Sequence, residues 1–363
     1  MSGVYPTEPF QPSDGAPDDN LGAGQPYDPN VDRNPPREDF DALNASDADL
    51  ATYNLPPRPD GATAPRALLS WKRAMSPPLY FVQGDRSDVM GPAPFGQHGD
   101  NTGSDVRVQE SSRNWSGAYI RSNGGGKFVL VEALWIVPKP SPPSPQRGKA
   151  QAGAAAFGSS VWVGLDGHDA VSMSLPQIGT AQFVTSDDKS GSQTPSRTFA
   201  WWQWWVRQAN NNAPMLIDRF PVTSGDLICC RVTVRTPDRI NFFIKNQSTG
   251  AAVSFDGSAP QSKNPAQVSQ KVLTEGRTAE WILERPTLIG SRELFPLPDY
   301  GVTLFYRCNA AVEADPGWEE LQLEQARLIA MKDWDGPNPG AVVSTPVRQN
   351  GSSLLLCYGG NLP

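Results

Sequence analysis

The stretch that decides the fold is Ala279–Glu284, which reads Ala-Glu-Trp-Ile-Leu-Glu. As a β-strand it places Glu280 and Glu284 on one face and Trp281 on the other, because side chains alternate along a strand. Ionised carboxylates resist burial unless they are paired or hydrogen-bonded. Two interpretations stay open: a solvated outer face with two ordinary glutamates, or a face that holds a glutamate for chemistry.

A second stretch rich in tryptophan, Ala200–Trp205, reads Ala-Trp-Trp-Gln-Trp-Trp. The same alternation places Trp201, Gln203 and Trp205 on one face of a strand. A polar group between aromatic walls is typical of a binding cleft for a peptide or a sugar. The alternative is that these aromatic side chains fill the hydrophobic core, and the stretch alone favours neither.

Strand-like segments separated by Gly, Pro, Asn and Asp turns continue along the chain from about residue 106. They lie at residues 115–122, 127–137, 160–165, 182–185, 200–208, 227–236, 239–246, 252–255, 279–284, 302–306 and 352–358. The first two predict a long hairpin that turns at Asn123–Gly126. Only residues 318–329 have a helix-like composition, and their leucines fit a strand nearly as well. This pattern predicts an all-β fold, an antiparallel double-sheet β-sandwich of the jelly-roll or concanavalin-like kind.

The first 105 residues differ from the rest of the chain. Residues 1–60 carry 12 acidic and 3 basic side chains, a net charge of −9, so the whole-chain value of −7 leaves +2 for the remainder. We expect residues 1–66 to form a disordered or extended acidic arm that adds no strand to the core. Residues 67–105 are apolar enough to dock, either as a pro-segment over a cleft or as padding outside the domain. The β-sandwich domain would then span residues 106–363.

Composition excludes several classes of protein. No basic patch of the kind that binds nucleic acid is visible, and no apolar run approaches the length of a membrane span. The four cysteines are too few for a disulfide framework and favour buried thiols, although the sequence leaves a single bridge open. Cys229 and Cys230 are adjacent on an expected strand, so we expect them to point to opposite faces. The chain lacks the nucleophile, zinc and phosphate-loop motifs, and neither His98 nor His168 has a recognisable catalytic setting.

Five segments in order resemble the motifs of the glutamic peptidases, the eqolisins. They are Asn114–Ala118, Trp162–Gly167, Gln177–Gly179, Ala200–Trp204 and Ala279–Glu284. The resemblance covers roughly residues 106–360. It implies a sandwich of two antiparallel sheets and an endopeptidase that hydrolyses a polypeptide substrate with a Gln/Glu dyad, without a cofactor or a metal. It also implies an extracellular monomer, although the first residues lack the pattern of a signal peptide.

Carried over by position, the dyad of this family corresponds to Gln177 and Glu284, with Trp115, Asp166, Trp201 and Gln203 as substrate-binding residues. An ionised Glu284 would take a proton from the attacking water and pass it to the leaving amine. The amide of Gln177 would donate a hydrogen bond to the oxyanion. Glu280 matches a neighbouring position of the family and not the catalytic one.

The chain departs from the family pattern at three positions near the dyad. Ala181, Phe199 and Gln203 stand where the resemblance implies acids. The family's cysteine after the Asp-Gly pair is also missing, so its disulfide is not expected. These departures keep a second hypothesis open, a β-sandwich that binds peptide or carbohydrate without catalysis.

Overall fold

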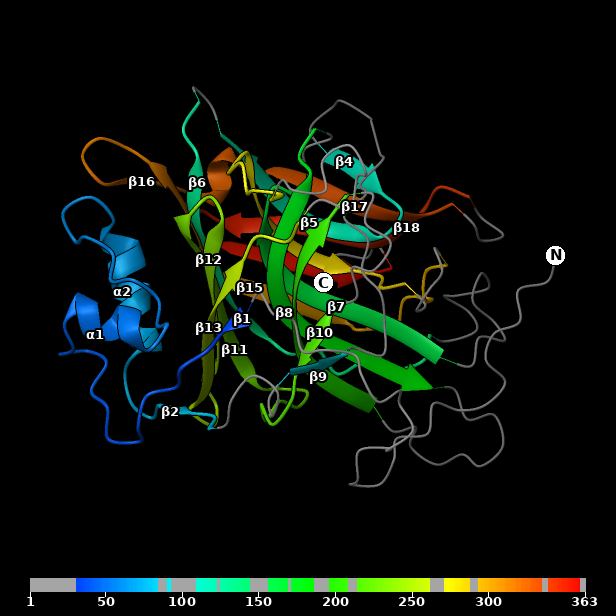
Figure 1. Ribbon diagram of the computed structural model, residues 1–363. Helices are drawn as coiled ribbons and strands as arrows, with labels where there is room; N and C mark the ends of the chain where they lie inside the picture. The colour runs from blue at the N-terminus through cyan, green and yellow to red at the C-terminus, as the bar shows by residue number, and fades with distance from the viewer. Residues whose placement is uncertain are drawn as a thin grey trace.

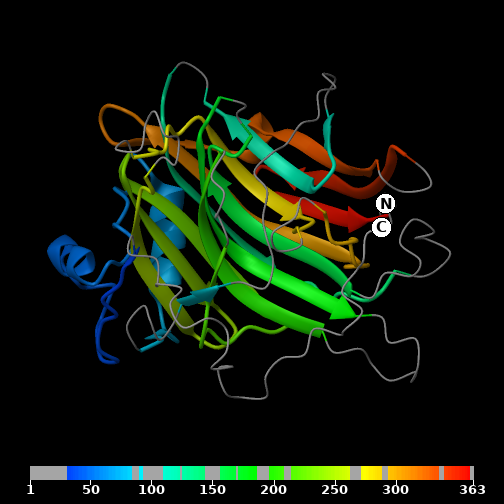
Figure 2. The ribbon, with the colours of Figure 1, turned by 45° about the vertical axis from the view of Figure 1, so that its right-hand side comes forward.

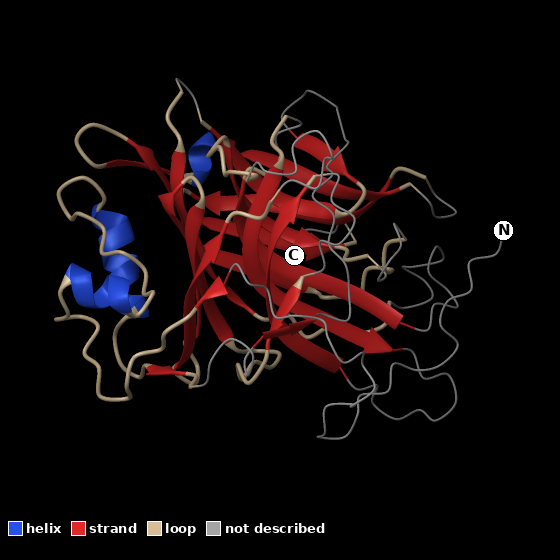
Figure 3. Ribbon diagram, viewed as in Figure 1, coloured by secondary structure: helices blue, strands red, loops and turns tan. Residues whose placement is uncertain are grey.

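The structure is a computed structural model, and it describes residues 31–83, 90–92, 109–122, 125–143, 156–168, 171–185, 196–207, 214–261, 271–287, 293–334 and 339–359. Strands dominate it, as Figure 3 shows in red, and the two α-helices lie together at one side. The prediction of an all-β sandwich built from antiparallel sheets is confirmed.

One layer, the front sheet, carries the tryptophan-rich strands. Its strands follow one another in space as β3(Met90–Pro92), β10(Met215–Ile217), β9(Ser196–Val206), β8(Ser174–Thr185), β7(Ala156–Leu165), β14(Thr278–Glu284), β5(Trp115–Arg121) and β17(Arg327–Asp333). All of these neighbours run antiparallel, and the short β4(Gln109–Ser112) adds to β17 in parallel. The long strands of this sheet run side by side in green in Figure 2.

The second layer, the back sheet, lies behind it. Its order is β1(Val31–Asp32), β13(Ala251–Ser258), β12(Arg239–Asn246), β11(Leu227–Thr236), β6(Phe128–Ile136), β15(Val302–Glu313) and β19(Ser353–Tyr358). Two short strands, β2(Tyr80–Phe81) and β16(Trp318–Leu321), extend it at β13 and β15. β18(Ala341–Asn350) pairs with both β17 and β19, and it therefore joins the two layers into one continuous sheet.

One local prediction is wrong, and one segment whose composition fitted either a helix or a strand is now assigned. β5 pairs with β14 and β17 in the front sheet, whereas β6 pairs with β11 and β15 in the back sheet, so residues 115–137 are no hairpin. Both strands are almost wholly buried on their two faces, and alternation then gives no sign of which neighbour each one takes. Residues 318–329 form β16, a 3₁₀ turn and the start of β17, and not a helix.

The main core lies between the two sheets. Trp202 and Trp204 of β9 and Trp281 of β14 point into it, where Trp202 packs on Phe242 and Phe255 of the back sheet at ring-centre distances of 5.3 and 5.0 Å. Trp201 and Trp205 point to the opposite side of β9 and belong to a separate cluster with Trp115 and Trp162. The stretch at 200–205 thus supplies both the core and the other face. We call the side of the front sheet turned away from this core the front face.

Residues 32–81 of the N-terminal segment pack against the outer side of the back sheet, away from the front face (Figures 1 and 2). α1(Asp47–Thr52) and α2(Pro65–Ala74) cover β11, β12 and β13 there, with Trp71 buried against them. The expectation that residues 1–66 add no strand is wrong for β1, which pairs with β13 and buries Val31. Within the docking segment, residues 67–83 lie on the outer side of the back sheet and residues 90–92 form β3 of the front sheet, whereas residues 84–89 and 93–105 lie outside the described residues. The choice between a pro-segment and padding stays a prediction.

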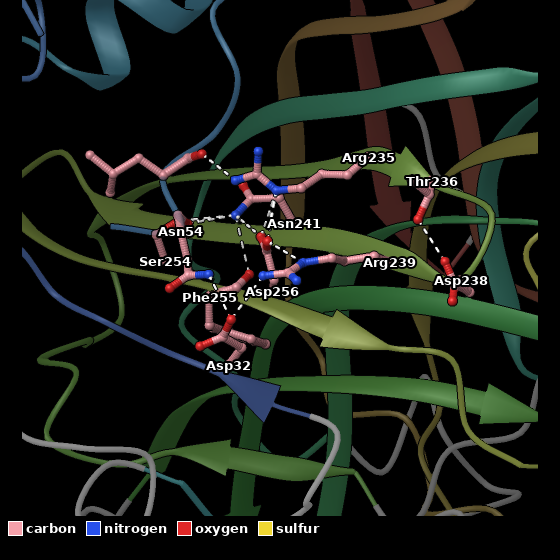
Figure 4. A network of polar contacts seen from close by, with 11 residues as sticks. Asp32, Asn54, Arg235, Thr236, Asp238, Arg239, Asn241, Ser254, Phe255 and Asp256 are labelled. Atoms are coloured by element: carbon pink, nitrogen blue, oxygen red, sulfur yellow. Dashed lines mark hydrogen bonds and ion pairs between the residues drawn. The ribbon is translucent and has the colours of Figure 1, made fainter. Parts of the chain in front are cut away.

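A polar network fastens this segment to the back sheet (Figure 4). Asp256, buried in β13, accepts hydrogen bonds from Arg235, Arg239 and Asn241 at 2.8–2.9 Å. The backbone carbonyl of Asn54 accepts a further hydrogen bond from the Asn241 amide at 2.7 Å. The other N–H groups of Arg235 and Arg239 donate to the Leu55 carbonyl and to Asp32 at 2.6 and 2.8 Å. Asp256 thus orients three donors of the sheet that bind residues 32–55, and together they fix a single register of this segment.

The four cysteines are buried thiols, as predicted. Cys229 packs beneath the helices and Cys230 lies in the main core, so the two neighbours do point to opposite faces of β11. Across the described ranges, no helix is long and apolar enough to cross a membrane.

Candidate active site

The front face is organised in rows that cross the strands. Residues directly opposite each other in antiparallel strands point to the same face. One row contains Glu280, Gly164, Gln177 and Gln203, taken across β14, β7, β8 and β9. A second row, two residues along, contains Ile282, Trp162, Gly179 and Trp201. A third contains Glu284, Ser160, Ala181 and Phe199.

Gln177 and Glu284 therefore lie on the same face, two strands and four register positions apart, with the row of Trp162 between them. Gln177 lies within β8, whereas the sequence predicted that the strand begins at Gln182. The early part of this strand is not evident from the sequence because Pro176 and Gly179 have a weak preference for strands. Pairing with β7 on one side and β9 on the other overrides that preference.

Glu284 is held by two N–H donors. The indole Nε1 of Trp162 donates to its Oε2 at 2.8 Å, and Nδ2 of Asn114 donates to its Oε1 at 3.1 Å. The residue is only 1% exposed, so the solvated outer face considered for this strand is wrong. Donors of this kind stabilise an ionised carboxylate within a low-dielectric site and fix its orientation.

Gln177 is fully buried, and its Nε2 donates to Oε1 of Gln203 at 2.8 Å. Its Oε1 has no hydrogen-bonding partner within the described part of the chain. A primary amide has two N–H groups, so one remains after the contact with Gln203.

Tryptophan side chains line the front face. Trp115 and Trp162 pack edge to face with ring centres 5.1 Å apart, and Trp201 is fully buried in the same cluster. Gly179 is opposite Trp162, and a Cβ at this position would lie 2.7 Å from the Trp162 Cβ and 2.1 Å from the Val161 carbonyl. A glycine is therefore required for β8 and β7 to approach this closely beneath the indole.

Asp166 lies at the end of β7, where its φ of 71° turns the chain. Its carboxylate accepts hydrogen bonds from the Thr274 hydroxyl at 2.6 Å and from three consecutive backbone N–H groups of residues 275–277 at 2.6–3.1 Å. Burial raises the pKa of Asp166, while these donors oppose the rise. Both carboxylate oxygens are thus engaged by the segment that leads into β14, and the substrate contact expected of Asp166 stays a prediction.

Asn114 and His168 were given no role by the sequence. Asn114 precedes Trp115, whose position opposite Glu284 becomes clear only when β5 and β14 are paired.

His168 stacks on Tyr119 with ring centres 3.6 Å apart, and its Nε2 lies 2.7 Å from Oε2 of Glu110. Partial burial acts to raise the pKa of Glu110, but hydrogen bonds from His168 and Tyr119 hold it at about 2.

The backbone N–H of His168 donates to Oε1 of Glu280 at 3.1 Å, which connects this group to the row of Gln177. The three positions at which the family resemblance implies acids also belong to these rows. Ala181 and Phe199 lie in the row of Glu284, and Gln203 lies in the row of Gln177. Near Glu284 the row therefore adds no second carboxylate that would repel its charge.

Two layers of antiparallel strands with a buried carboxylate and a carboxamide among tryptophans are features of a hydrolase of the glutamic peptidase class. A family model described as the peptidase A4 family matches residues 113–355, and the chain belongs to this family. The resemblance identified from the sequence is thereby confirmed.

Solved structures of this class are similar to the chain. Scytalido-glutamic peptidase with a peptide-based transition-state analogue is 21% identical over 68% of this chain and 98% of its own, with a TM-score of 0.48. SCP-B, an eqolisin in complex with the tripeptide Ala-Ile-His, has the same identity and coverage and a TM-score of 0.45. Aspergilloglutamic peptidase from Aspergillus niger is 20% identical over 56% of this chain and 99% of its own, with a TM-score of 0.42. No curated protein matches the chain.

Proposed function

We propose that the protein is a glutamic endopeptidase in which Glu284 is the general base and Gln177 is the oxyanion donor. The observation that carries the proposal is the position of both side chains on one face of the front sheet, with Glu284 oriented by Trp162 and Asn114. Membership of the peptidase A4 family supports a polypeptide as the substrate.

In the proposed reaction a water molecule between the two side chains attacks the scissile carbonyl. Glu284 accepts a proton from this water and later donates it to the leaving amine. The remaining N–H of Gln177 donates to the oxyanion of the tetrahedral intermediate, a contribution of about 3–4 kcal/mol for a well-placed donor. The N–H groups of Trp162 and Asn114 keep the carboxylate of Glu284 ionised and aimed at the water.

Both members of the proposed dyad are closed to solvent, with exposures of 0% and 1%. A peptide can contact them only when neighbouring side chains move aside. Such opening is common among peptidases and can limit the rate of turnover.

The test is digestion of a denatured protein between pH 2 and pH 7 in the presence of pepstatin, which inhibits aspartic peptidases. The wild type is compared with Glu284→Gln, Gln177→Ala and the surface control Glu319→Gln. We expect Glu284→Gln to lower kcat at least about 10³-fold and Gln177→Ala about 10²- to 10³-fold, while the control is unchanged. Folding of each variant is checked by near-UV circular dichroism. A wild type that cuts no peptide bond, or a folded Glu284→Gln variant with full activity, would refute the assignment.

A further inference from the structure

We propose that Glu280, carrying a proton, is a positioning residue that fixes the orientation of the Gln177 amide. The inference rests on the proposed function of Gln177, and it adds a third side chain to the machinery. Glu280 and Gln177 lie in one row of the front face and are separated only by Gly164 of β7.

Gly164 places no side chain of its own between these two residues, and the Leu175 side chain lies next to this position. A Cβ at this position would lie 3.1 Å from the Gln177 Cβ and 2.8 Å from Cδ1 of Leu175. The backbones of β14 and β8 are two strand spacings apart, about 9–10 Å. A glutamate and a glutamine side chain that extend toward each other span this gap, directly or through one water molecule.

The hydrogen bonds of Glu280 and Gln177 leave one buried oxygen atom on each side chain without a partner among the described residues. The Glu280 carboxyl has one oxygen, Oε1, that accepts from the His168 backbone, and a second, Oε2, that is buried without a partner among the described residues. The Gln177 Oε1 is also buried without a partner. Two oxygens can share a hydrogen bond only if one of them carries a proton, and a buried acceptor without a donor costs about 1–3 kcal/mol.

The surroundings favour that proton. Glu280 is fully buried, and burial raises its pKa to about 8. The Thr278 hydroxyl and the backbone N–H groups of His168 and Gly167 oppose this rise, whereas the charge of Asp166 adds to it. Tyr119 is opposite Glu280 on β5, and its hydroxyl is engaged by Glu110 at 2.6 Å. The imidazole of His168 and the guanidinium of Arg327 on β17 also lie against Glu110, and not against Glu280. A neutral Glu280 is therefore consistent with the charged groups of the described residues that lie near it.

The orientation of Gln177 matters because its two ends have opposite polarity. With Nε2 toward the substrate the amide stabilises an oxyanion, whereas a flipped amide presents an oxygen lone pair to it. Gln203 accepts from Gln177, but an amide can also donate, so this contact permits either orientation. A protonated carboxyl at 280 can donate to the Gln177 oxygen and thereby selects the productive one.

The experiment measures kcat and KM for wild type, Glu280→Leu, Glu280→Gln, and Glu280→Leu combined with Gln203→Glu. We expect Glu280→Leu to lower kcat about 10²-fold with little change in KM, because the donor is lost. Glu280→Gln, which keeps a donor, should stay within about threefold of wild type. Gln203→Glu should restore at least about tenfold to the leucine variant, because an ionised carboxylate only accepts and so imposes the same orientation.

A loss that is purely structural would not be repaired at position 203, so absence of that rescue overturns the proposal. Full kcat in a folded Glu280→Leu variant, or a Glu280→Gln variant as impaired as the leucine variant, also overturns it. If Glu280→Leu does not fold, ¹³C NMR of glutamate-labelled protein decides. The Glu280 carboxyl should titrate at a lower pH in Gln177→Leu than in wild type, since the protonated form loses its acceptor, and an unchanged midpoint refutes the contact. This titration is independent of turnover, so it separates failure of the inference from failure of the proposed function.

Discussion

The indole of Trp162 reaches from the row of Ile282 to the carboxylate of Glu284, where Nε1 donates to Oε2 at 2.8 Å. One side chain thus serves two purposes, since it also forms the wall against Trp115. The strength of the proposed base depends on this contact, because a hydrogen bond to the ionised form makes that form easier to keep as the pH falls.

Trp162→Phe should keep the wall and remove the donor. We expect kcat/KM to fall about tenfold and the acid limb of its pH profile to move to higher pH, because the ionised form of Glu284 loses a hydrogen bond. Trp204→Phe is the matched control, since its Nε1 points into the core and has no partner among the described residues. An acid limb that is identical in the two variants would contradict a role for the Trp162 N–H.

Asp166→Ala should destabilise the fold by about 3–5 kcal/mol, because three backbone N–H groups of residues 275–277 and the Thr274 hydroxyl lose their buried acceptor. Asp166→Asn tolerates the left-handed backbone and keeps one acceptor oxygen, so its loss should be about half as large. Urea unfolding measures both free energies. Equal stability of wild type and the alanine variant would show that these hydrogen bonds do not hold the segment.

Asp256→Ala tests the network of Figure 4. It leaves Arg235, Arg239 and Asn241 without their shared acceptor, and we expect a loss of about 3 kcal/mol in the free energy of unfolding. Asp238→Ala is the control, because its ion pair with Lys271 is exposed on both sides and should contribute less than about 1 kcal/mol. Similar losses for the two variants would argue against a stabilising role of the buried Asp256 network in attaching the N-terminal segment.

The raised pKa of Glu280 predicts a dependence of stability on pH. Burial raises the pKa of Glu280 to about 8 in the folded protein, whereas the unfolded chain releases this proton near the ordinary glutamate pKa of 4.5. The resulting stabilisation is complete below pH 4.5 and is lost as the pH rises toward 8, by at most about 1.4 kcal/mol per pH unit. The difference in unfolding free energy between wild type and Glu280→Gln isolates this group. A difference that is constant from pH 4.5 to pH 8 would contradict the prediction.

Much of the fold could be predicted from sequence because strand periodicity is local. β11 and β12 have the predicted bounds, and the face assignment of Trp201, Trp202 and Trp204 followed from alternation. What alternation cannot supply is pairing. Wherever both faces of a strand are buried, as in β5 and β6, the partner depends on the whole assembly, and the expected hairpin failed there.

The candidate site shows the same division. Motif positions placed Gln177 and Glu284, and the structure puts them on one face, while their catalytic roles stay a prediction. The substrate contact expected of Asp166 also stays a prediction, and the donors that occupy its carboxylate come from a segment more than 100 residues away. Partners at that separation leave no trace in a local pattern.

The attachment of the N-terminal segment has a consequence for the order of folding during synthesis on the ribosome, because its binding surface is made much later. The backbone carbonyl of Asn54 accepts a hydrogen bond from the Ser254 hydroxyl, and Ser254 is synthesised 200 residues later. At ordinary rates of translation this amounts to about 10–40 s, during which the indole of Trp71 has no sheet to cover it. The two helices made first are thus among the last elements to settle, and a nascent chain stalled before β13 should present them to chaperones.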